Sequence, residues 1–141
     1  MEELLPYLIP ELANIVLEYT RLAGVCTTVL TGHTNCVNYI CELRDGRLVS
    51  CSSNRTIRIW EGLECTAVLT GHTGSVYHVC ELKDGRLASC SLDRTIRVWE
   101  GKGLECTAVL TGHTNGVLHV CELKDGRLAS CSWDHTIRIW Y

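Results

Sequence analysis

The stretch CTAVLTGHTGSVYHVCELKDGRLASCSLDRTIRVWEG, from Cys65 to Gly101, decides the fold, because the chain contains three closely similar copies of it. The other two copies begin at Cys26 and Cys106, so successive copies start 39 and 41 residues apart. Such a period indicates a fold of small stacked units, each of which needs neighbours to bury its apolar surface. The 141-residue chain therefore divides into a leader and three repeats: 1–25, 26–64, 65–105 and 106–141.

Each copy is predicted to form four short strands. In the second copy the first strand ends at Leu69, and the others cover 76–82, 86–91 and 96–99. The Asp84-Gly85 pair predicts a two-residue hairpin of type I′, which needs positive φ at both positions. Short, evenly spaced strands joined by turns indicate small antiparallel sheets repeated around an axis.

Residues at fixed offsets in every copy resemble the WD-repeat family of β-propellers. Each copy has a Gly-His pair, a Ser four residues before an Asp or Asn, and a Trp six residues after it. The resemblance covers 26–141 and implies an all-β chain of three four-stranded antiparallel blades, preceded by a short N-terminal helix. Glu61 and Glu100 stand where the family usually has an Asp after the Trp, and Tyr141 occupies the third such position.

The resemblance implies one buried hydrogen-bond network in each blade, made by His, Ser, Asp and Trp. A buried Trp N–H can donate to the Ser hydroxyl, which can donate to one His nitrogen, while the other nitrogen donates to the carboxylate. Asn54 carries no charge, so we expect the first blade to be the least stable. The matching residues are His33, Ser50, Asn54, Trp60, His72, Ser89, Asp93, Trp99, His113, Ser130, Asp134 and Trp140.

Ser, His and Asp are also the residues of many hydrolases, so an enzyme is an alternative interpretation. A catalytic Ser occurs once at an exposed turn, whereas these serines occur three times within predicted strands. The sequence has no Gly-x-Ser-x-Gly motif. The repeated pattern therefore favours a structural role over catalysis, and no catalytic residue is predicted.

Nine of the ten cysteines occupy three equivalent strand positions, and only Cys36 stands alone. We interpret the repeated cysteines as small buried residues. No Cys-x-x-Cys pair is present, so no metal or other cofactor is predicted. Ten free thiols indicate a reducing compartment, the cytoplasm or nucleus. His78 and His119 are predicted to lie at the surface or at a blade edge.

Recognition in propellers of this family usually uses one face, around the central channel. The matching positions lie near the Gly-His loop, at the start of the following strand and just before the turn Asp. The copies disagree most at these positions, where core packing imposes no constraint; neutral drift would give the same variation. The predicted partner-binding residues are Cys36, Asn38, Ser53, Ser75, Tyr77, Leu92, Gly116, Leu118 and Trp133.

The leader has the pattern of an amphipathic helix, with an apolar face that includes Leu12, Ile15, Val16 and Tyr19. The segment resembles the opening helix of an F-box, which implies a ubiquitin ligase scaffold as a partner. The alternative is a helix that only caps an exposed blade edge. Both interpretations remain open at this point.

Three blades are fewer than the four to eight of an ordinary propeller, and they leave two apolar faces open. The chain begins with a predicted outermost strand, 26–30, which in a closed ring would complete the last blade. We therefore expect self-association, with two chains closing a six-bladed ring. The alternative is a truncated relic of a longer gene with no activity of its own.

The net charge is −3, from 13 Lys and Arg against 16 Asp and Glu, which argues against nucleic acid or an anionic membrane as the partner. No apolar run is long enough for a membrane span. The sequence thus predicts a non-enzymatic scaffold that binds other proteins, with substrate recognition as an adaptor among the roles it could serve.

Overall fold

The computed structural model describes residue 24 and residues 26–141. The predicted leader helix, with Leu12, Ile15, Val16 and Tyr19, lies outside the described residues. Residues 32–141 form one compact unit. Within the described part, the structure contains no helix with the length and apolar character that a membrane crossing requires.

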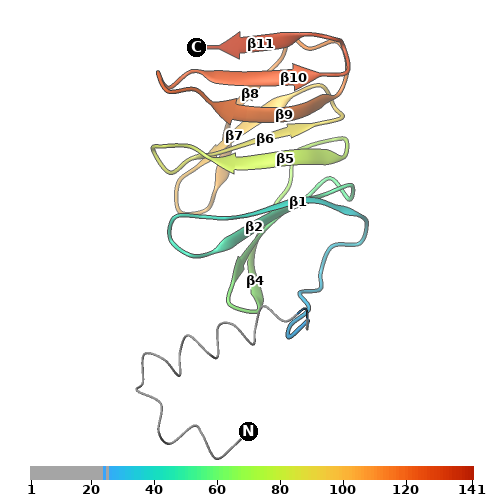
Figure 1. The fold of residues 1–141 in the computed structure, drawn as a ribbon, viewed down its shortest axis with the longest axis vertical. Coiled ribbons are helices and arrows are strands. Elements are labelled where there is room, and N and C mark those ends of the chain that lie inside the picture. The colour runs from blue at the N-terminus through green and yellow to red at the C-terminus, as the bar shows by residue number, and fades with distance from the viewer. Residues whose placement is uncertain (1–23, 25) are drawn as a thin grey trace, which may run out of the picture. The chain divides into compact units, whose positions relative to one another are not determined.

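The unit 32–141 consists of three antiparallel sheets (Figure 1), which confirms the all-β class. The first sheet contains β1 (Val37–Glu42), β2 (Leu48–Ser52), β3 (Ile57–Glu61) and β4 (Glu64–Leu69). The second contains β5 (Val76–Glu81), β6 (Leu87–Ser91), β7 (Ile96–Glu100) and β8 (Glu105–Leu110). The third contains β9 (Val117–Glu122), β10 (Leu128–Ser132) and β11 (Ile137–Trp140).

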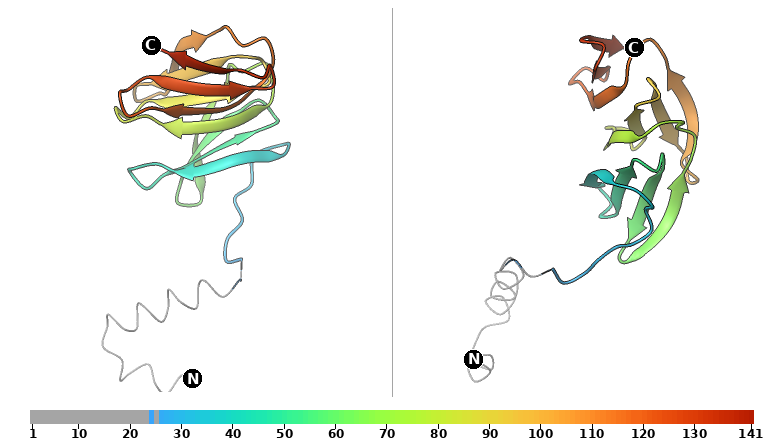
Figure 2. Two further views of the ribbon diagram at one scale, coloured as in Figure 1. Left: turned by 45° about the horizontal axis from the view of Figure 1, so that its top comes forward. Right: turned by 90° about the vertical axis from the view of Figure 1, so that its right-hand side faces the viewer.

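The sheets follow one another like the blades of a propeller. Their first strands, β1, β5 and β9, lie side by side, and the remaining strands of each sheet extend away from them (Figure 1; Figure 2, right). The first and second sheets each end on a strand contributed by the next sequence repeat, since β4 contains Cys65 and β8 contains Cys106, where the second and third repeats begin. This stagger links neighbouring blades through the chain itself.

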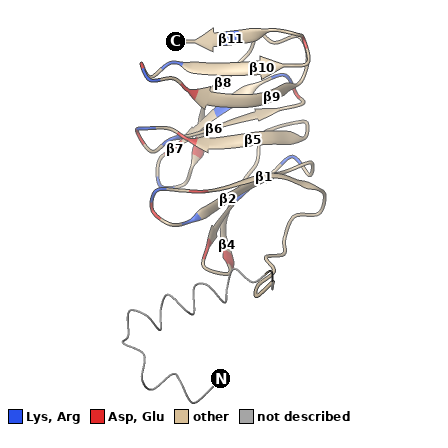
Figure 3. Ribbon diagram, viewed as in Figure 1, with Lys and Arg blue, Asp and Glu red and all other residues tan. Residues whose placement is uncertain are grey.

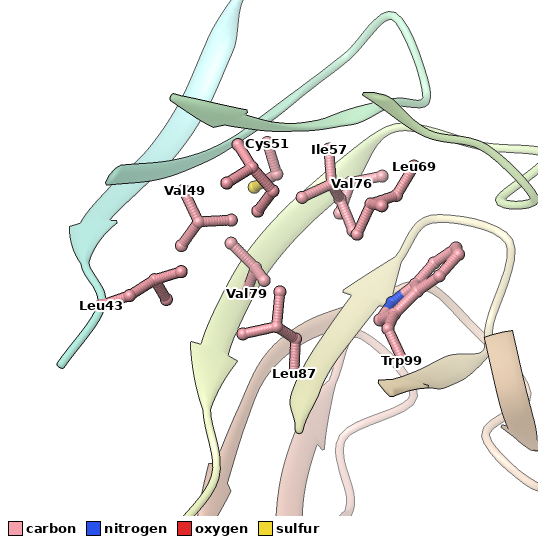
Figure 4. Packing of buried hydrophobic residues seen from close by; sticks show 10 residues of the cluster. Leu43, Val49, Cys51, Ile57, Leu69, Val76, Val79, Leu87 and Trp99 are labelled. Carbon is pink, nitrogen blue, oxygen red and sulfur yellow. The ribbon is translucent and has the colours of Figure 1, made fainter. Parts of the chain in front are cut away.

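Two apolar clusters fill the spaces between the three sheets. Between the first two sheets, Val49, Cys51 and Ile57 pack with Val79 and other residues of the second sheet (Figure 4). The equivalent residues Ala88, Cys90 and Ile96 form the second cluster with Val117 and Val120. Successive residues of a strand point to opposite faces of its sheet, and here both faces carry apolar side chains. Among the described residues only the middle sheet has a neighbour on each side, so only its two faces are both covered.

The third sheet has three strands. Residues 26–30, which were predicted to form a strand that would complete the last blade of a closed ring, form no strand. A strand forms only where a partner edge supplies its backbone hydrogen bonds. Because no strand pairs with the other side of β11, β11 is an edge strand among the described residues.

The predicted type I′ turn at Asp84-Gly85 is wrong. Gly85 has φ +90°, but Asp84 does not have positive φ. Leu82 N–H donates to Arg86 O, and Gly85 N–H donates to Leu82 O. The loop therefore has three residues and ends on a left-handed glycine, the other common hairpin solution.

Candidate functional site

The second blade contains a continuous hydrogen-bond chain that starts in its interior. The indole Nε1 of Trp99 donates to Ser89 Oγ at 2.8 Å, and His72 Nε2 lies 2.8 Å from the same oxygen. His72 Nδ1 lies 2.7 Å from Asp93 Oδ2. Because Ser89 accepts from Trp99, its proton is available to Nε2, and Nδ1–H donates to the carboxylate. Thr95 anchors the other carboxylate oxygen at 2.6 Å.

The third blade repeats this chain, and the first blade carries a weaker version of it. Trp140, Ser130, His113 and Asp134 are linked at 2.8, 2.8 and 2.6 Å. In the first blade Trp60, Ser50 and His33 are linked at 2.8 and 2.8 Å. The last link differs, since Asn54 Oδ1 lies 3.4 Å from His33 Nδ1. The amide thus replaces a short charge-assisted bond with a long neutral one.

The two aspartates of the networks are held in the charged form. Burial opposes ionisation of Asp93, but hydrogen bonds from His72 and Thr95 outweigh burial and hold its pKa well below the usual range. Burial likewise opposes ionisation of Asp134, and bonds from Thr136 and His113 lower its pKa in the same way. In the first blade, burial lowers the pKa of His33, and the bond to Asn54 only partly opposes this.

The serines of these networks are poorly placed for catalysis. Ser89 is fully buried, and its hydroxyl is engaged by both Trp99 and His72. A nucleophile needs a free approach for its substrate, which a buried and doubly bonded hydroxyl lacks. The arrangement instead ties the Gly-His loop to the two strands that carry the Ser and the Trp, which in the second blade are β6 and β7.

The partner-binding residues predicted from the sequence come together at one edge of the blades. Backbone hydrogen bonds join Ser53 N to Cys36 O, Leu92 N to Ser75 O, and Trp133 N to Gly116 O, at 2.9, 2.9 and 3.0 Å. The Asn38 side chain donates to Ser53 Oγ at 3.0 Å and to Val76 O at 2.8 Å. The turns before β3, β7 and β11, which carry Ser53, Leu92 and Trp133, lie along the right-hand edge of Figure 1.

Across the second and third blades these residues form a continuous apolar surface. The rings of Tyr77 and Trp133 meet edge to face, with centroids 5.6 Å apart. A Cβ atom at position 116 would lie 2.9 Å from Leu92 Cδ1 and 3.4 Å from Trp133 Cε3. Because Gly116 has no Cβ, the side chains of Leu92 and Trp133 can both pack against its backbone. Leu92 and Trp133 are 40% and 48% exposed. Leu118 is half-buried. We call Tyr77, Leu92 and Trp133 the aromatic patch.

The two strand histidines lie at blade edges, as predicted, since β5 and β9 are edge strands of their sheets. His119 is exposed, whereas His78 is buried. Tyr39, His78 and His119 occupy equivalent positions on β1, β5 and β9, and their rings form a stack with centroid spacings of 4.2 and 3.8 Å. Burial, assisted by the charge of His119, lowers the pKa of His78 to about 4. Alignment of the repeats places these rings in register, but it does not reveal how closely the innermost strands approach.

Basic side chains clamp each blade to the next, a feature that the sequence interpretation missed. Arg44 donates to the carbonyls of Leu82 and Lys83, and its backbone N–H donates to Glu81 at 2.8 Å. Lys83 repeats the contact one blade later, donating to Leu123 O and Lys124 O at 2.8 and 2.9 Å. Its backbone N–H donates to Glu122 at 2.7 Å. Arg44 and Lys83 lie in the turns that follow β1 and β5, and Figure 3 shows blue and red segments in turns of this kind.

The cysteines are free thiols, and their burial depends on the blade. Cys51 and Cys90 are buried, as expected, and burial raises the pKa of the Cys51 thiol to about 12. Their third-blade counterpart Cys131 is only half-buried, and Cys26, Cys36 and Cys121 are exposed. The described residues contain no group of three or more His, Cys, Asp or Glu side chains suited to a metal ion.

Comparisons with known proteins agree with this architecture. A family described as "WD domain, G-beta repeat" matches residues 24–61, 63–100 and 104–141. Among solved structures, the chain is similar to the "Crystal structure of WD40 beta propeller domain of Doa1", with a TM-score of 0.73 and 26% identity. The match covers 77% of this chain and 38% of that chain, so it spans less than half of the other propeller's length. No curated protein matches the sequence.

Proposed function

Because the chain belongs to the WD40-repeat family, we propose that it is a non-enzymatic platform on which other proteins are bound. The observation that carries the proposal is the aromatic patch, in which Tyr77 and Trp133 are in contact and Trp133 remains 48% exposed. Aromatic side chains held rigidly at a partly exposed surface are typical of interface hot spots. The hydrogen-bond networks beneath support the patch by fixing the turns that carry it.

A binding selection with a matched control tests this proposal. Peptides or small domains are selected from a displayed library on the immobilised chain, and their dissociation constants are measured for the parent and for Trp133→Ala, Tyr77→Ala and Tyr141→Ala. We expect the first two variants to weaken binding about tenfold or more. Tyr141 is fully exposed at the far end of β11 and serves as the control aromatic residue. Equal binding by all four chains would exclude the aromatic patch as the binding surface.

The proposed platform is completed by a second copy of the chain. Val37 and Ile40 on the first sheet are 54% and 55% exposed, whereas their counterparts Val76 and Val79 are fully buried. At the other end, Ile137 is 75% exposed, whereas its counterparts Ile57 and Ile96 are fully buried. The open faces are thus the same two kinds of face that pack together between neighbouring blades. We call them the first-sheet face and the third-sheet face.

Self-association is tested by charging one open face. Ile137→Asp would bury an unpaired carboxylate in an assembled ring, so we expect the dissociation constant to rise about a hundredfold. Val109→Asp is the matched control. Val109 and its counterpart Val68 are both 44% exposed although they lie in different blades, so their exposure does not depend on an open face. If both variants associate as the parent does, the third-sheet face takes no part in assembly.

We further propose that residues 1–25 serve as the adaptor segment of a ubiquitin ligase substrate receptor, and that the chain works in the reducing cytoplasm or nucleus. Support comes from the helical spacing of Leu12, Ile15, Val16 and Tyr19 and from the ten free thiols. Capture of a ligase scaffold protein by the full chain, lost in Ile15→Glu and kept in Trp133→Ala, is the expected result. Equal capture by Ile15→Glu and the parent would contradict it.

A further inference from the structure

Within the described part of the chain, the outer edge of the third sheet lacks the strand that completes each of the other two. In the first sheet β4 pairs with β3, and in the second β8 pairs with β7. The equivalent strand β11 pairs only with β10 among the described residues. Its backbone therefore presents an unpaired row of donors and acceptors, which is a template for strand addition.

The segment Cys26-Thr-Thr-Val-Leu30 matches the strands that fill this position in the other sheets. Those strands contain Cys65-Thr-Ala-Val-Leu69 and Cys106-Thr-Ala-Val-Leu110. The segment differs from both by a single residue, Thr28 in place of Ala67 and Ala108. Residues 26–30 are nevertheless in no strand, and Val29 is 73% exposed.

We propose that residues 26–30 of a second copy add to β11 as the fourth strand of the third sheet. This inference rests on the self-association proposed above and specifies how the two copies are joined. The register follows from the other blades, where Ile57 pairs with Leu69 and Ile59 pairs with Ala67. Transferred to the third sheet, Ile137 pairs with Leu30, Arg138 with Val29, and Ile139 with Thr28 of the second copy.

Charge complementarity and the shape of the third-sheet face favour a second copy as the occupant. Lys124 is equivalent to Arg44 and Lys83, each of which clamps the carbonyls and the glutamate of the next blade. In a second copy the next glutamate is Glu42, which is exposed here, as Lys124 is. Thus the cation and the carboxylate of the missing clamp are both present on one chain.

An open pocket of about 200 Å³ lies on the third-sheet face, lined by Cys121, Ala129, Cys131 and Ile137 among others. The equivalent residues of the first sheet, including Cys41, Val49 and Cys51, pack with Val76 and Val79 of the second sheet. By equivalence the pocket would receive the residues that correspond to Val76 and Val79, and in a second copy these are Val37 and Ile40. His119, at its rim, would continue the ring stack onto Tyr39 of the second copy.

A cross-linking experiment between two differently substituted chains tests the strand addition. One chain carries Thr28→Cys and the other carries Ile139→Cys, so that a 28–139 disulfide can form only between copies. Directly opposite residues of antiparallel strands lie at a separation that a disulfide can span. Pairing Thr28→Cys with Ile137→Cys is the off-register control, and peptide mass spectrometry separates the new bond from those of native thiols. We expect at least a tenfold excess of the in-register bond.

Proline substitutions give a second measurement that does not depend on thiols. Adjacent N–H groups of a strand point to opposite sides, so one of Thr28→Pro and Val29→Pro removes a donor to β11 while the other does not. We expect one of them to weaken association at least tenfold, with Thr28→Ala and Val29→Ala remaining within about twofold of the parent. Because these residues lie outside the compact unit 32–141, the substitutions leave its strands intact.

The outcomes separate this inference from the proposals on which it rests. A dimer that forms without the 28–139 bond and is unaffected by either proline would overturn strand addition and leave self-association standing. A 28–139 bond that forms only within one doubly substituted chain, at a rate independent of concentration, would show that the segment pairs with its own β11. A chain that remains monomeric overturns both strand addition and self-association. None of these three outcomes bears on peptide binding at the aromatic patch.

Discussion

The amide oxygen of Asn54 lies 3.4 Å from Nδ1 of His33, a separation at which little of a hydrogen bond's strength remains. The carboxylates at the equivalent positions lie 2.7 and 2.6 Å from their histidines. The three networks are otherwise alike, so this contact identifies the weakest point of the first blade.

Replacing Asn54 with Asp is expected to stabilise the protein. The new carboxylate can accept from His33 with charge assistance and keeps the two bonds from Thr56 that Asn54 Oδ1 now accepts. We expect a gain of about 1 kcal/mol in the free energy of unfolding, measured by urea denaturation. Asp93→Asn is the mirror control and should lose a similar amount or more. A loss of stability in Asn54→Asp would contradict this account of the first network.

Gly71 should be far less tolerant of alanine than Gly85. Both have positive φ, at +146° and +90°, but a Cβ at Gly71 would lie 2.9 Å from Arg97 Nη1 and 3.4 Å from Trp99 Cη2. A Cβ at Gly85 would meet nothing within 4 Å. We expect Gly71→Ala to cost about 1 to 2 kcal/mol more than Gly85→Ala, because only the former combines backbone strain with a clash. Equal costs would show that Arg97 moves aside freely.

The buried histidine predicts a loss of stability in mildly acidic solution. His78 has a pKa of about 4 in the folded chain, below its ordinary 6.5, so the unfolded chain binds more protons between these values. Stability from this site is therefore complete above pH 6.5 and falls as the pH drops toward 4. The carboxylates of Asp93 and Asp134, whose pKa values are lowered, lose their contribution only at more acidic pH.

The first repeat supplies the natural replacement, since Tyr39 occupies the position of His78. In His78→Tyr the unfolding free energy should change much less between pH 6.5 and pH 4 than it does in the parent. His119→Tyr, at an exposed site, should keep most of the parent's change with pH. Thermal or urea unfolding at several pH values measures the slope. An unchanged slope in His78→Tyr would place the pH dependence elsewhere.

Thiol labelling should report the state of the third-sheet face. Cys131 is half-buried, whereas its counterparts Cys51 and Cys90 are buried, with pKa values raised by burial. If a second copy covers this face, alkylation of Cys131 should slow as protein concentration rises, while half-buried Cys106, which packs between the first two sheets, reacts at a constant rate. Mass spectrometry of peptides resolves the two sites. Concentration-independent labelling of Cys131 would speak against coverage.

The repeats predicted most of the fold because they fix the period, the strands and the polar residues at constant offsets. The strands predicted at 76–82 and 96–99 differ from β5 and β7 by one residue each. Failures occurred where the outcome depends on contacts beyond one repeat. The segment 26–30, for example, needs a partner edge to become a strand. The Asp84-Gly85 loop is an exception within one repeat, because the Leu82–Arg86 hydrogen bond encloses three residues where the Asp-Gly pair predicted two.

The same reason explains what was missed at the surface. A single repeat shows that His78 alternates with core residues, but not that the ring of Tyr39 covers it from the neighbouring blade. The clamp of Arg44 onto Leu82 and Lys83 also crosses between blades. Equivalence of positions does locate Tyr77, Leu92 and Trp133, because variation among near-identical copies stands out against a constant core.

Sedimentation velocity of the unmodified chain, over roughly 1 to 100 µM, tests the central claim that three blades form half of a ring. The account predicts a species of twice the 15.7 kDa chain mass that gains population with concentration and does not grow further, because two head-to-tail contacts close the ring. A folded 15.7 kDa species that persists alone across the whole range would contradict it.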